Sequence, residues 1–189
     1  MRYRETNEKL AAYRHEIGAL RDKMRALQAS VEPEEVADYV FVGADGPVRL
    51  SQLFGDKDTL FVVHNMGRSC PNCTMWADGF NGVLGHLENR AAFAVTSPDD
   101  PATQAAFAAS RGWRFLMVSH QGTGFAADMG YRGDIGWLPG VSVFKKDGDR
   151  VFRVSDQGLH PGDDFCLVWH LFDMIPEGPA GWRAQFTYK

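Results

Sequence analysis

The sequence predicts an α/β fold of three layers, in which a mixed central sheet is flanked by helices and preceded by an N-terminal helical extension. Strand-like runs at 59–63 and 91–96 are each followed by a helical pattern. That alternation is typical of parallel strands joined by right-handed crossovers. A strand–turn–strand pattern around Asp147-Gly148 follows. Because a hairpin adds antiparallel strands, we expect a mixed sheet.

The first segment, from about Thr6 to Ser30, has the apolar spacing of a long helix. Its hydrophobic residues recur at alternating steps of three and four, a 3.5-residue period held for three heptads. This stripe either packs on the protein's own domain or forms a seam with a second subunit, which would give a homodimer through the N-terminal helix. The stripe consists of Leu10, Tyr13, Ile17, Leu20, Met24, Leu27 and Val31.

Prolines mark the expected boundaries of the main domain. Pro33 follows the long helix, and Pro176 opens a tail without periodicity. We therefore expect a helical extension over 1–32, a main domain over 33–176 and a C-terminal tail over 177–189.

Within the main domain, the run at 59–63 is apolar and β-branched without alternation, which favours a central strand covered on both faces. Trp76, Phe80, Val83, Leu84 and Leu87 fall on one face of the helical pattern that follows. The other expected elements are a strand at 39–42, a turn at 45–47, a helical turn at 50–54, a buried strand at 91–96, a helix from Pro101 to near Gly112, a glycine-rich stretch at 122–140, strands at 141–144 and 150–154, and a final helix at 165–172.

Composition narrows the class of protein. The 189 residues are 44% hydrophobic and 23% charged, as in ordinary globular proteins, and the formal net charge is −4. This charge gives no reason to expect nucleic acid or an anionic membrane as a partner. The N-terminus has no apolar signal segment, and no apolar run approaches the ~20 residues that span a bilayer. We expect a cytoplasmic protein without a cofactor.

The two closely spaced cysteines, Cys70 and Cys73, carry the strongest chemical signal. They lie where a strand leads into a helix, so Cys70 should sit at the helix N-terminus, near unpaired N–H groups that favour a thiolate. A helix end lowers a thiol pKa by roughly one unit from ~8.5. Pro71 suits the first helical turn, and Arg68 would add to the shift if it faced the sulfur. We assign Cys70 as nucleophile and Cys73 as resolving thiol.

A metal-binding role and a purely structural role for this cysteine pair both stay open. The pair could be half of a zinc site, with Cys166 and His170 on the final helix as the remaining ligands. It could also be two reduced thiols in the core, because free cysteine is commonly buried. Cys166 lies in a run that looks like core, and we expect no metal.

The residues around these cysteines resemble the thioredoxin superfamily. The stretch 138–148, with Leu138-Pro139 before an apolar strand and a glycine turn, looks like the superfamily's cis-proline strand and hairpin. The resemblance implies a cis Leu138–Pro139 bond beside Cys70, which would offer the Leu138 backbone to a substrate peptide. Trp76 and Trp137 are further candidates for facing substrate.

More narrowly, the chain is similar to the bacterial family known as domain of unknown function 899. The stretches that carry the similarity are 67–73, 76–82, 93–95, 111–113 and 139–144. The family implies a dithiol–disulfide oxidoreductase or isomerase, whose partner is a protein or small-molecule disulfide or thiol.

The sequence also departs from the thioredoxin pattern. Thioredoxins have a buried Asp six residues before the first cysteine, and His64 stands there instead. This histidine is either a hydrogen-bonded structural imidazole or a proton relay to the resolving thiol. Peroxidases of this superfamily usually carry Thr three residues before the reactive cysteine, where this chain has Gly67.

We therefore predict a thiol–disulfide oxidoreductase that reduces, forms or isomerises disulfides. The alternative is a non-enzymatic binding or assembly module that keeps the fold, which the N-terminal stripe and the aromatic, glycine-rich segment would support. A thiol peroxidase is the less favoured enzyme.

Overall fold

A computed structural model describes residues 2–189, and the chain divides into two compact units with the boundary after Pro33. The first unit is one long helix, α1 (Tyr3–Ala29). None of the described residues of α1 is buried, and the seven residues of the predicted stripe are all exposed to solvent. No helix within residues 2–189 has both the length and the apolar character to cross a membrane.

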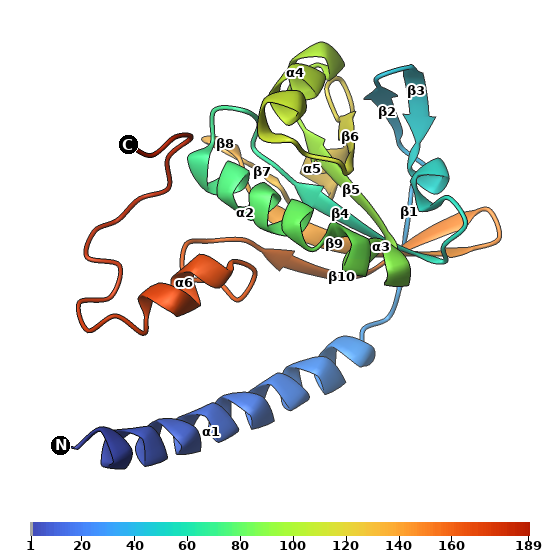
Figure 1. The fold of residues 1–189 in the computed structure, drawn as a ribbon. Coiled ribbons are helices and arrows are strands. Elements are labelled where there is room, and N and C mark those ends of the chain that lie inside the picture. The colour runs from blue at the N-terminus through green and yellow to red at the C-terminus, as the bar shows by residue number, and fades with distance from the viewer. Residues whose placement is uncertain (1) are drawn as a thin grey trace. The chain divides into compact units, whose positions relative to one another are not determined.

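The second unit, Glu34–Lys189, is built on an eight-stranded sheet with the order β1-β10-β9-β4-β5-β6-β2-β3 (Figure 1). Its strands are β1 (Glu34–Val36), β2 (Val40–Gly43), β3 (Gly46–Arg49), β4 (Thr59–His64), β5 (Ala92–Ser97), β6 (Leu116–Ser119), β9 (Gly140–Asp147) and β10 (Arg150–Gly158), and a separate two-stranded sheet holds β7 (Arg132–Gly133) and β8 (Gly136–Trp137). The helices of this unit are η1 (Leu50–Phe54), α2 (Pro71–Gly82), α3 (Leu84–Arg90), α4 (Pro101–Arg111), α5 (Phe125–Asp128) and α6 (Leu167–Phe172).

The sheet is mixed, as predicted. Strands β4, β5 and β6 are parallel, while β9 pairs antiparallel with β4 and β10 antiparallel with β9. The turn at Asp147-Gly148 joins β9 to β10, which confirms the predicted hairpin. The parallel strands follow from the connections, because α2 with α3 links β4 to β5, and α4 links β5 to β6.

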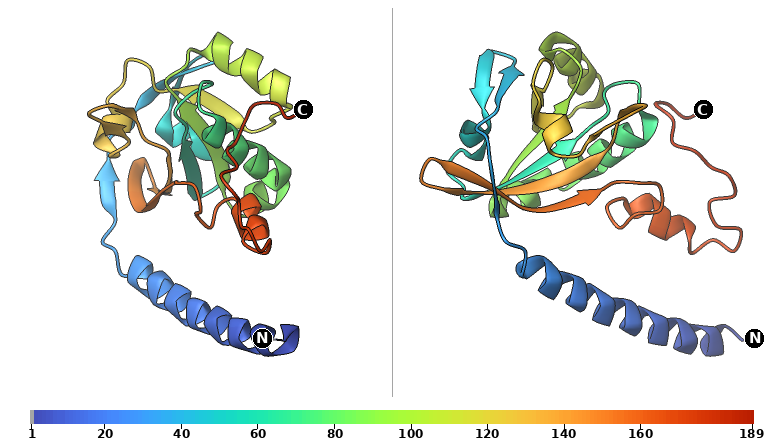
Figure 2. Two further views of the ribbon diagram at one scale, coloured as in Figure 1. Left: turned by 90° about the vertical axis from the view of Figure 1, so that its left-hand side faces the viewer. Right: turned by 180° about the vertical axis from the view of Figure 1, so that it is seen from behind.

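Strand β4 lies in the middle of the sheet and is buried on both faces, as its unbroken apolar sequence predicts. Phe61 and Val63 face the cluster that contains residues of α2, α3 and α6. Leu60 and Val62 face the other cluster, which contains residues of η1 and α5. Figures 1 and 2 show α2 and α5 on opposite faces of the sheet. Side chains of successive β4 residues thus contact different helices.

Several elements differ from the sequence predictions. No strand or helix was predicted in the segments that form β1, β3, β6, β7, β8 and α5. The helix predicted through Leu87 is broken at Val83, whose φ of −110° and ψ of 11° separate α2 from α3. Val83 is exposed rather than on the buried face, and the preceding Gly82 is a weak helix former that permits the break.

Candidate active site

Cys70 is the N-cap residue of α2, with extended φ and ψ of −99° and 105°. Its sulfur accepts a hydrogen bond from the backbone N–H of Cys73 at 3.1 Å, in the place where a serine or aspartate oxygen usually caps a helix. Pro71 occupies the first helical turn, where its missing N–H leaves no intrahelical bond unmade. The Thr74 hydroxyl donates to the Cys70 carbonyl oxygen at 3.0 Å. These contacts fix the Cys70 sulfur at the helix N-terminus.

The loop between β4 and Cys70 is held by two side chains that were not predicted to act there. Asn65 Oδ1 accepts from the Gly67 N–H at 2.8 Å, and Asp99 Oδ2 accepts from the Arg68 N–H at 2.7 Å. Gly67 has a φ of +97°, and a Cβ atom there would stand 2.9 Å from Asp99 Oδ2. The positive φ therefore favours glycine at position 67, and a Cβ atom there would push the Asp99 carboxylate away from its present place.

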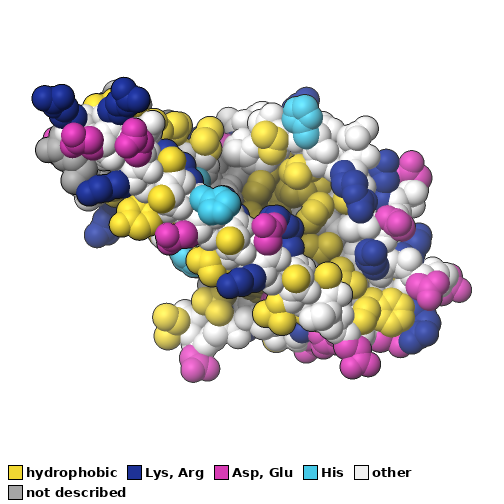
Figure 3. Space-filling view, turned by 90° about the horizontal axis from the view of Figure 1, so that it is seen from below, with side chains coloured by type: hydrophobic (Ala, Val, Ile, Leu, Met, Phe, Trp, Pro, Cys, Tyr) yellow, Lys and Arg dark blue, Asp and Glu magenta, His cyan; other side chains and the backbone are white. Residues whose placement is uncertain are grey.

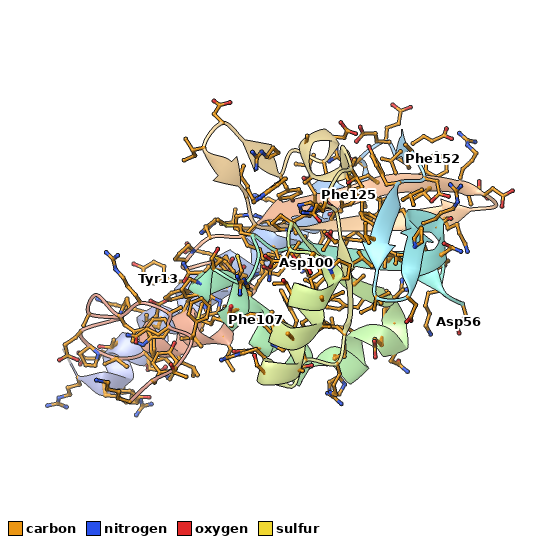
Figure 4. The ribbon with its side chains drawn as sticks, turned by 90° about the horizontal axis from the view of Figure 1, so that it is seen from above. Tyr13, Asp56, Asp100, Phe107, Phe125 and Phe152 are labelled. Carbon is orange, nitrogen blue, oxygen red and sulfur yellow. The ribbon has the colours of Figure 1, made fainter. Side chains whose placement is uncertain are left out.

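Asp99 lies just before α4, whose first turn Asp100 caps by accepting from the Thr103 N–H at 2.9 Å (Figure 4). The connection from β5 to α4 thus supplies the carboxylate that anchors the connection from β4 to α2. The sequence held one signal for this role of Asp99, namely a polar residue shortly after the end of a parallel strand. The carboxyl ends of parallel strands meet at one edge of a sheet, so residues that follow β4 and β5 come close together.

The pKa of Cys70 is lowered to about 7. The largest cause is the hydrogen bond from the Cys73 thiol, and the backbone N–H groups of Cys73 and Asn72 act in the same direction, while partial burial opposes them. The pKa of Cys73 is raised, because its thiol donates to Cys70 and is itself buried beside that sulfur. The two thiols are thus strongly unequal, because Cys70 ionises far more readily than Cys73.

All three cysteines are free, and only Cys70 has appreciable exposure. Cys73 and Cys166 lie in the same apolar cluster, and burial raises the pKa of the Cys166 thiol. Over residues 2–189, no group of three or more His, Cys, Asp or Glu side chains is placed to hold a metal ion. His170 instead lies 3.3 Å from Asp164, on the exposed side of α6.

Arg68 lies on the surface beside α4, where it lines a pocket of about 470 Å³ with residues that include Ala102 and Phe107. The groups that lower the pKa of Cys70 belong to Cys73 and Asn72, and Arg68 is not among them. The contribution expected from this guanidinium is therefore absent in the present arrangement.

His64 lies on the opposite face of the sheet from the two cysteines. Its Nε2 is 2.8 Å from the Ser142 hydroxyl, and its ring stacks on Tyr131 with centroids 3.8 Å apart and on Phe125 (labelled in Figure 4) at 5.3 Å. Burial lowers the pKa of His64 to about 3, so the imidazole is neutral. The geometry fits the structural role, because the rings that His64 stacks on belong to one buried cluster and Cys73 belongs to the other.

The Leu138–Pro139 bond is trans, and residues 2–189 contain no cis peptide bond, so the predicted cis-proline is wrong. The trans form is the ordinary state of an X–Pro bond. The Leu138 N–H donates to the Tyr131 carbonyl at 2.9 Å, and the Pro139 carbonyl accepts from the Leu159 N–H at 2.9 Å. These groups are occupied within the chain, so they do not form the free pairing edge that was expected. Gly140 pairs with His64, which places Pro139 at the edge where β4 ends.

The two tryptophan candidates differ. Trp76 is only 2% exposed, and its indole N–H donates to Asp163 at 3.3 Å, so the prediction that it faces substrate is wrong. It belongs to the buried hydrophobic cluster that also contains Trp169 of α6, where its large ring fills part of the core. Trp137 and Leu138 both reach the surface. The Trp137 ring packs under the Arg132 guanidinium at 4.1 Å, a cation–π contact.

Comparison with known proteins gives one family and several similar folds. A family model described as "Bacterial protein of unknown function (DUF899)" matches residues 1–186. No curated protein matches the sequence. The peroxidoxin BcpB of Mycobacterium tuberculosis is 30% identical, with a TM-score of 0.54, over 67% of this chain and 84% of that one.

Two more distant structures show the same fold. A peroxiredoxin-like protein of Aquifex aeolicus is 18% identical with a TM-score of 0.53, over 67% of this chain and 75% of that one. The reduced Prx3 of Vibrio vulnificus, solved with hydrogen peroxide, is 12% identical with a TM-score of 0.57, over 70% of this chain and 90% of that one. The fold is thus thioredoxin-like, as the sequence motifs indicated.

Proposed function

This chain belongs to the DUF899 family, and on that premise we propose that it is a thiol–disulfide oxidoreductase with Cys70 as nucleophile and Cys73 as resolving thiol. The similarity to a peroxidoxin supports a thiol redox enzyme at the coarse level. The observation that carries the finer proposal is the pair of hydrogen bonds, from the Cys73 N–H and thiol, to the Cys70 sulfur.

These contacts favour a thiolate at neutral pH. With a pKa of about 7, half of Cys70 is thiolate at pH 7, compared with ~3% for an ordinary thiol of pKa ~8.5. A thiolate near its own pKa also keeps most of its intrinsic nucleophilicity. Cys70 is therefore placed and ionised for attack on a disulfide.

The reaction balances within the cysteine pair and the substrate. The Cys70 thiolate attacks a substrate disulfide, forms a mixed disulfide and releases one substrate sulfur as thiolate. Cys73 then attacks the Cys70 sulfur, which forms the Cys70–Cys73 disulfide and releases the second substrate sulfur. The Cys73 proton passes to a departing thiolate. The substrate gains two electrons and the protein loses two.

The first step also activates the second. The pKa of Cys73 is raised chiefly because its thiol donates to the Cys70 thiolate. A mixed disulfide at Cys70 carries no charge, so this cause disappears and Cys73 ionises more readily. The resolving thiol is thus held protonated until it is needed.

A single set of variants tests the proposal. Reduced protein should lose its fast alkylation at pH 7 in Cys70→Ser, keep it in Cys166→Ser, and keep most of it in Cys73→Ser. Cys73→Ser should accumulate a mixed disulfide with a model disulfide substrate, because nothing resolves it. If Cys70→Ser alkylates as fast as the native protein, or turns over a disulfide substrate normally, the assignment is wrong.

Peroxide reduction is a second candidate, favoured by the 30% identity to the M. tuberculosis peroxidoxin. The Cys70 thiolate would take one oxygen from a peroxide, giving a sulfenic acid and, with one proton, an alcohol or water. Cys73 would condense with the sulfenic acid to a disulfide and water. Consumption of peroxide by reduced protein, at a rate that exceeds disulfide reduction, would favour this activity. Absence of a Cys70 sulfenic acid in Cys73→Ser treated with peroxide would exclude it.

A further inference from the structure

Within its own unit, over residues 2–33, the hydrophobic stripe that runs along α1 to Val31 is not covered by other residues. Its seven residues are exposed to between 43% for Leu10 and 72% for Leu27. Hydrophobic side chains lie among charged groups of both signs on the face shown in Figure 3. Soluble proteins rarely expose a continuous apolar patch unless it binds something, and long helices obtain most of their stability from packing of one face. The stripe therefore needs a partner surface.

The spacing of the stripe indicates what kind of surface that is. From Leu10 to Val31 the steps alternate three and four, which places Leu10, Ile17, Met24 and Val31 at heptad position a, and Tyr13, Leu20 and Leu27 at position d. The flanking e and g positions are polar, namely Asn7, Arg14, Arg21 and Gln28 at e, and Lys9, Glu16, Lys23 and Ser30 at g. A helix that packs on a globular domain usually has a wider apolar face, whereas a strict a/d stripe is the seam of a coiled coil.

We propose that α1 forms a parallel, two-stranded coiled coil with α1 of a second copy of this chain. The residue types select this partner among coiled coils. β-Branched Ile17 stands at a, and Leu20 and Leu27 stand at d, the arrangement that favours two parallel strands over three or four. Val31, the last residue of the heptad pattern, follows the end of α1. The helix of 27 residues is about 40 Å long, and it contains the seam residues from Leu10 to Leu27.

The charges beside the seam are nearly balanced. In the parallel arrangement Glu16 faces the partner's Arg21, an attractive pair, while Lys9 faces the partner's Arg14, a repulsive one. Exposed pairs of this kind contribute little, so burial of the hydrophobic seam decides the association. The dimer should accordingly depend weakly on salt.

The oligomeric state of the full chain tests the proposal. Sedimentation equilibrium should give twice the 21.0 kDa chain mass. Leu20→Glu puts charges into the seam and should weaken the dimer by at least about 100-fold. Ala19→Glu is the matched control, because the neighbouring residue lies outside the seam at position c and should leave the dimer intact. Both substitutions lie outside the Glu34–Lys189 unit in the sequence, and the near-UV circular dichroism of the protein should stay native.

The orientation of the helices is tested by a photo-crosslink. Tyr13→p-benzoyl-phenylalanine should join two chains at residues close to position 13 of the partner. An antiparallel pair would instead place Tyr13 opposite the partner's Met24. The proposal is overturned by a monomeric native chain, by a trimer or tetramer, by a dimer that survives Leu20→Glu, or by a crosslink centred on the partner's Met24.

Discussion

The ring of Tyr131 lies so close to Gly140 that a Cβ atom on Gly140 would stand 1.9 Å from Cε1 of the ring. Gly140 begins β9 and pairs with His64 at the end of β4. The His64 ring in turn stacks on Tyr131 at 3.8 Å. Gly140, His64 and Tyr131 pack together on the face of the sheet opposite the cysteines. This packing leaves no room for a side chain at position 140.

We expect Gly140→Ala to lower the free energy of unfolding by about 3 kcal/mol, because either the ring or the β9 backbone must move. Urea denaturation measures this. Gly79→Ala on α2 is the control: its Cβ would meet nothing within 4 Å, so alanine should be neutral or stabilise by up to about 1 kcal/mol. The Tyr131→Leu variant should tolerate Gly140→Ala better than the native chain does. Equal costs in both backgrounds would show that the ring is not the obstacle.

The hydrogen bond from the Cys73 thiol is the largest cause of the lowered pKa of Cys70, so removing it should raise that pKa. In Cys73→Ala we expect alkylation of Cys70 at pH 7 to slow several-fold, because less of the thiol is ionised. Cys73→Ser keeps a hydroxyl donor and should slow it less. The pH dependence of iodoacetamide labelling measures both. A profile for Cys73→Ala that matches the native protein would mean that the helix N-terminus alone sets the pKa.

Local sequence signals predicted the centre of the sheet and the position of the cysteines. The run at 59–63 needed no distant information, because a strand covered on both faces is apolar throughout. Likewise, the Asp147-Gly148 pair carries its own turn chemistry. The cysteine pair was predictable because a strand end and a helix start lie within one short segment.

Features that depend on distant residues were not predictable. Strand β1 begins with Glu34 and Glu35, which look like a linker, but these carboxylates accept hydrogen bonds from Arg153 at 2.9 Å and Arg150 at 3.0 Å on β10. Whether His64 and the cysteines lie on the same face of the sheet depends on which face of β4 the helix α2 covers. The local sequence does not show which face that is. The cis bond at Pro139 was implied by resemblance alone, and the contacts of Leu138 and Pro139 in this chain override it.

Stability should fall in mild acid because His64 is buried and neutral. Its pKa is about 3 in the folded protein, below the ~6.5 of the unfolded chain, so the unfolded state binds more protons as the pH drops below ~6.5. Between pH 7 and pH 5 this one group should reduce the free energy of unfolding by about 2 kcal/mol. His120, whose pKa burial lowers to about 4, acts in the same direction.

The test of this prediction is urea denaturation at pH 5 to 8. His64→Gln should flatten the pH dependence below ~6.5 while lowering stability at pH 7. His86→Gln is the control, because His86 is exposed on α3, and its slope should match the native one. A native protein equally stable at pH 5 and pH 7 would contradict a buried, neutral His64.

Asp163 should be the main support of the segment that leads into α6. It is 6% exposed, and its carboxylate accepts from the His160 N–H at 3.0 Å, the Phe165 N–H at 2.9 Å and the Trp76 indole at 3.3 Å. Asp163→Ala leaves these donors unpaired, and we expect a loss of about 3 kcal/mol in urea denaturation. Asp163→Asn keeps one acceptor oxygen in place of two, and it should lower the free energy of unfolding by less than Asp163→Ala does. Asp164, the exposed neighbour, gives the control variant Asp164→Ala, and a cost as large there would show that Asp163 has no special role.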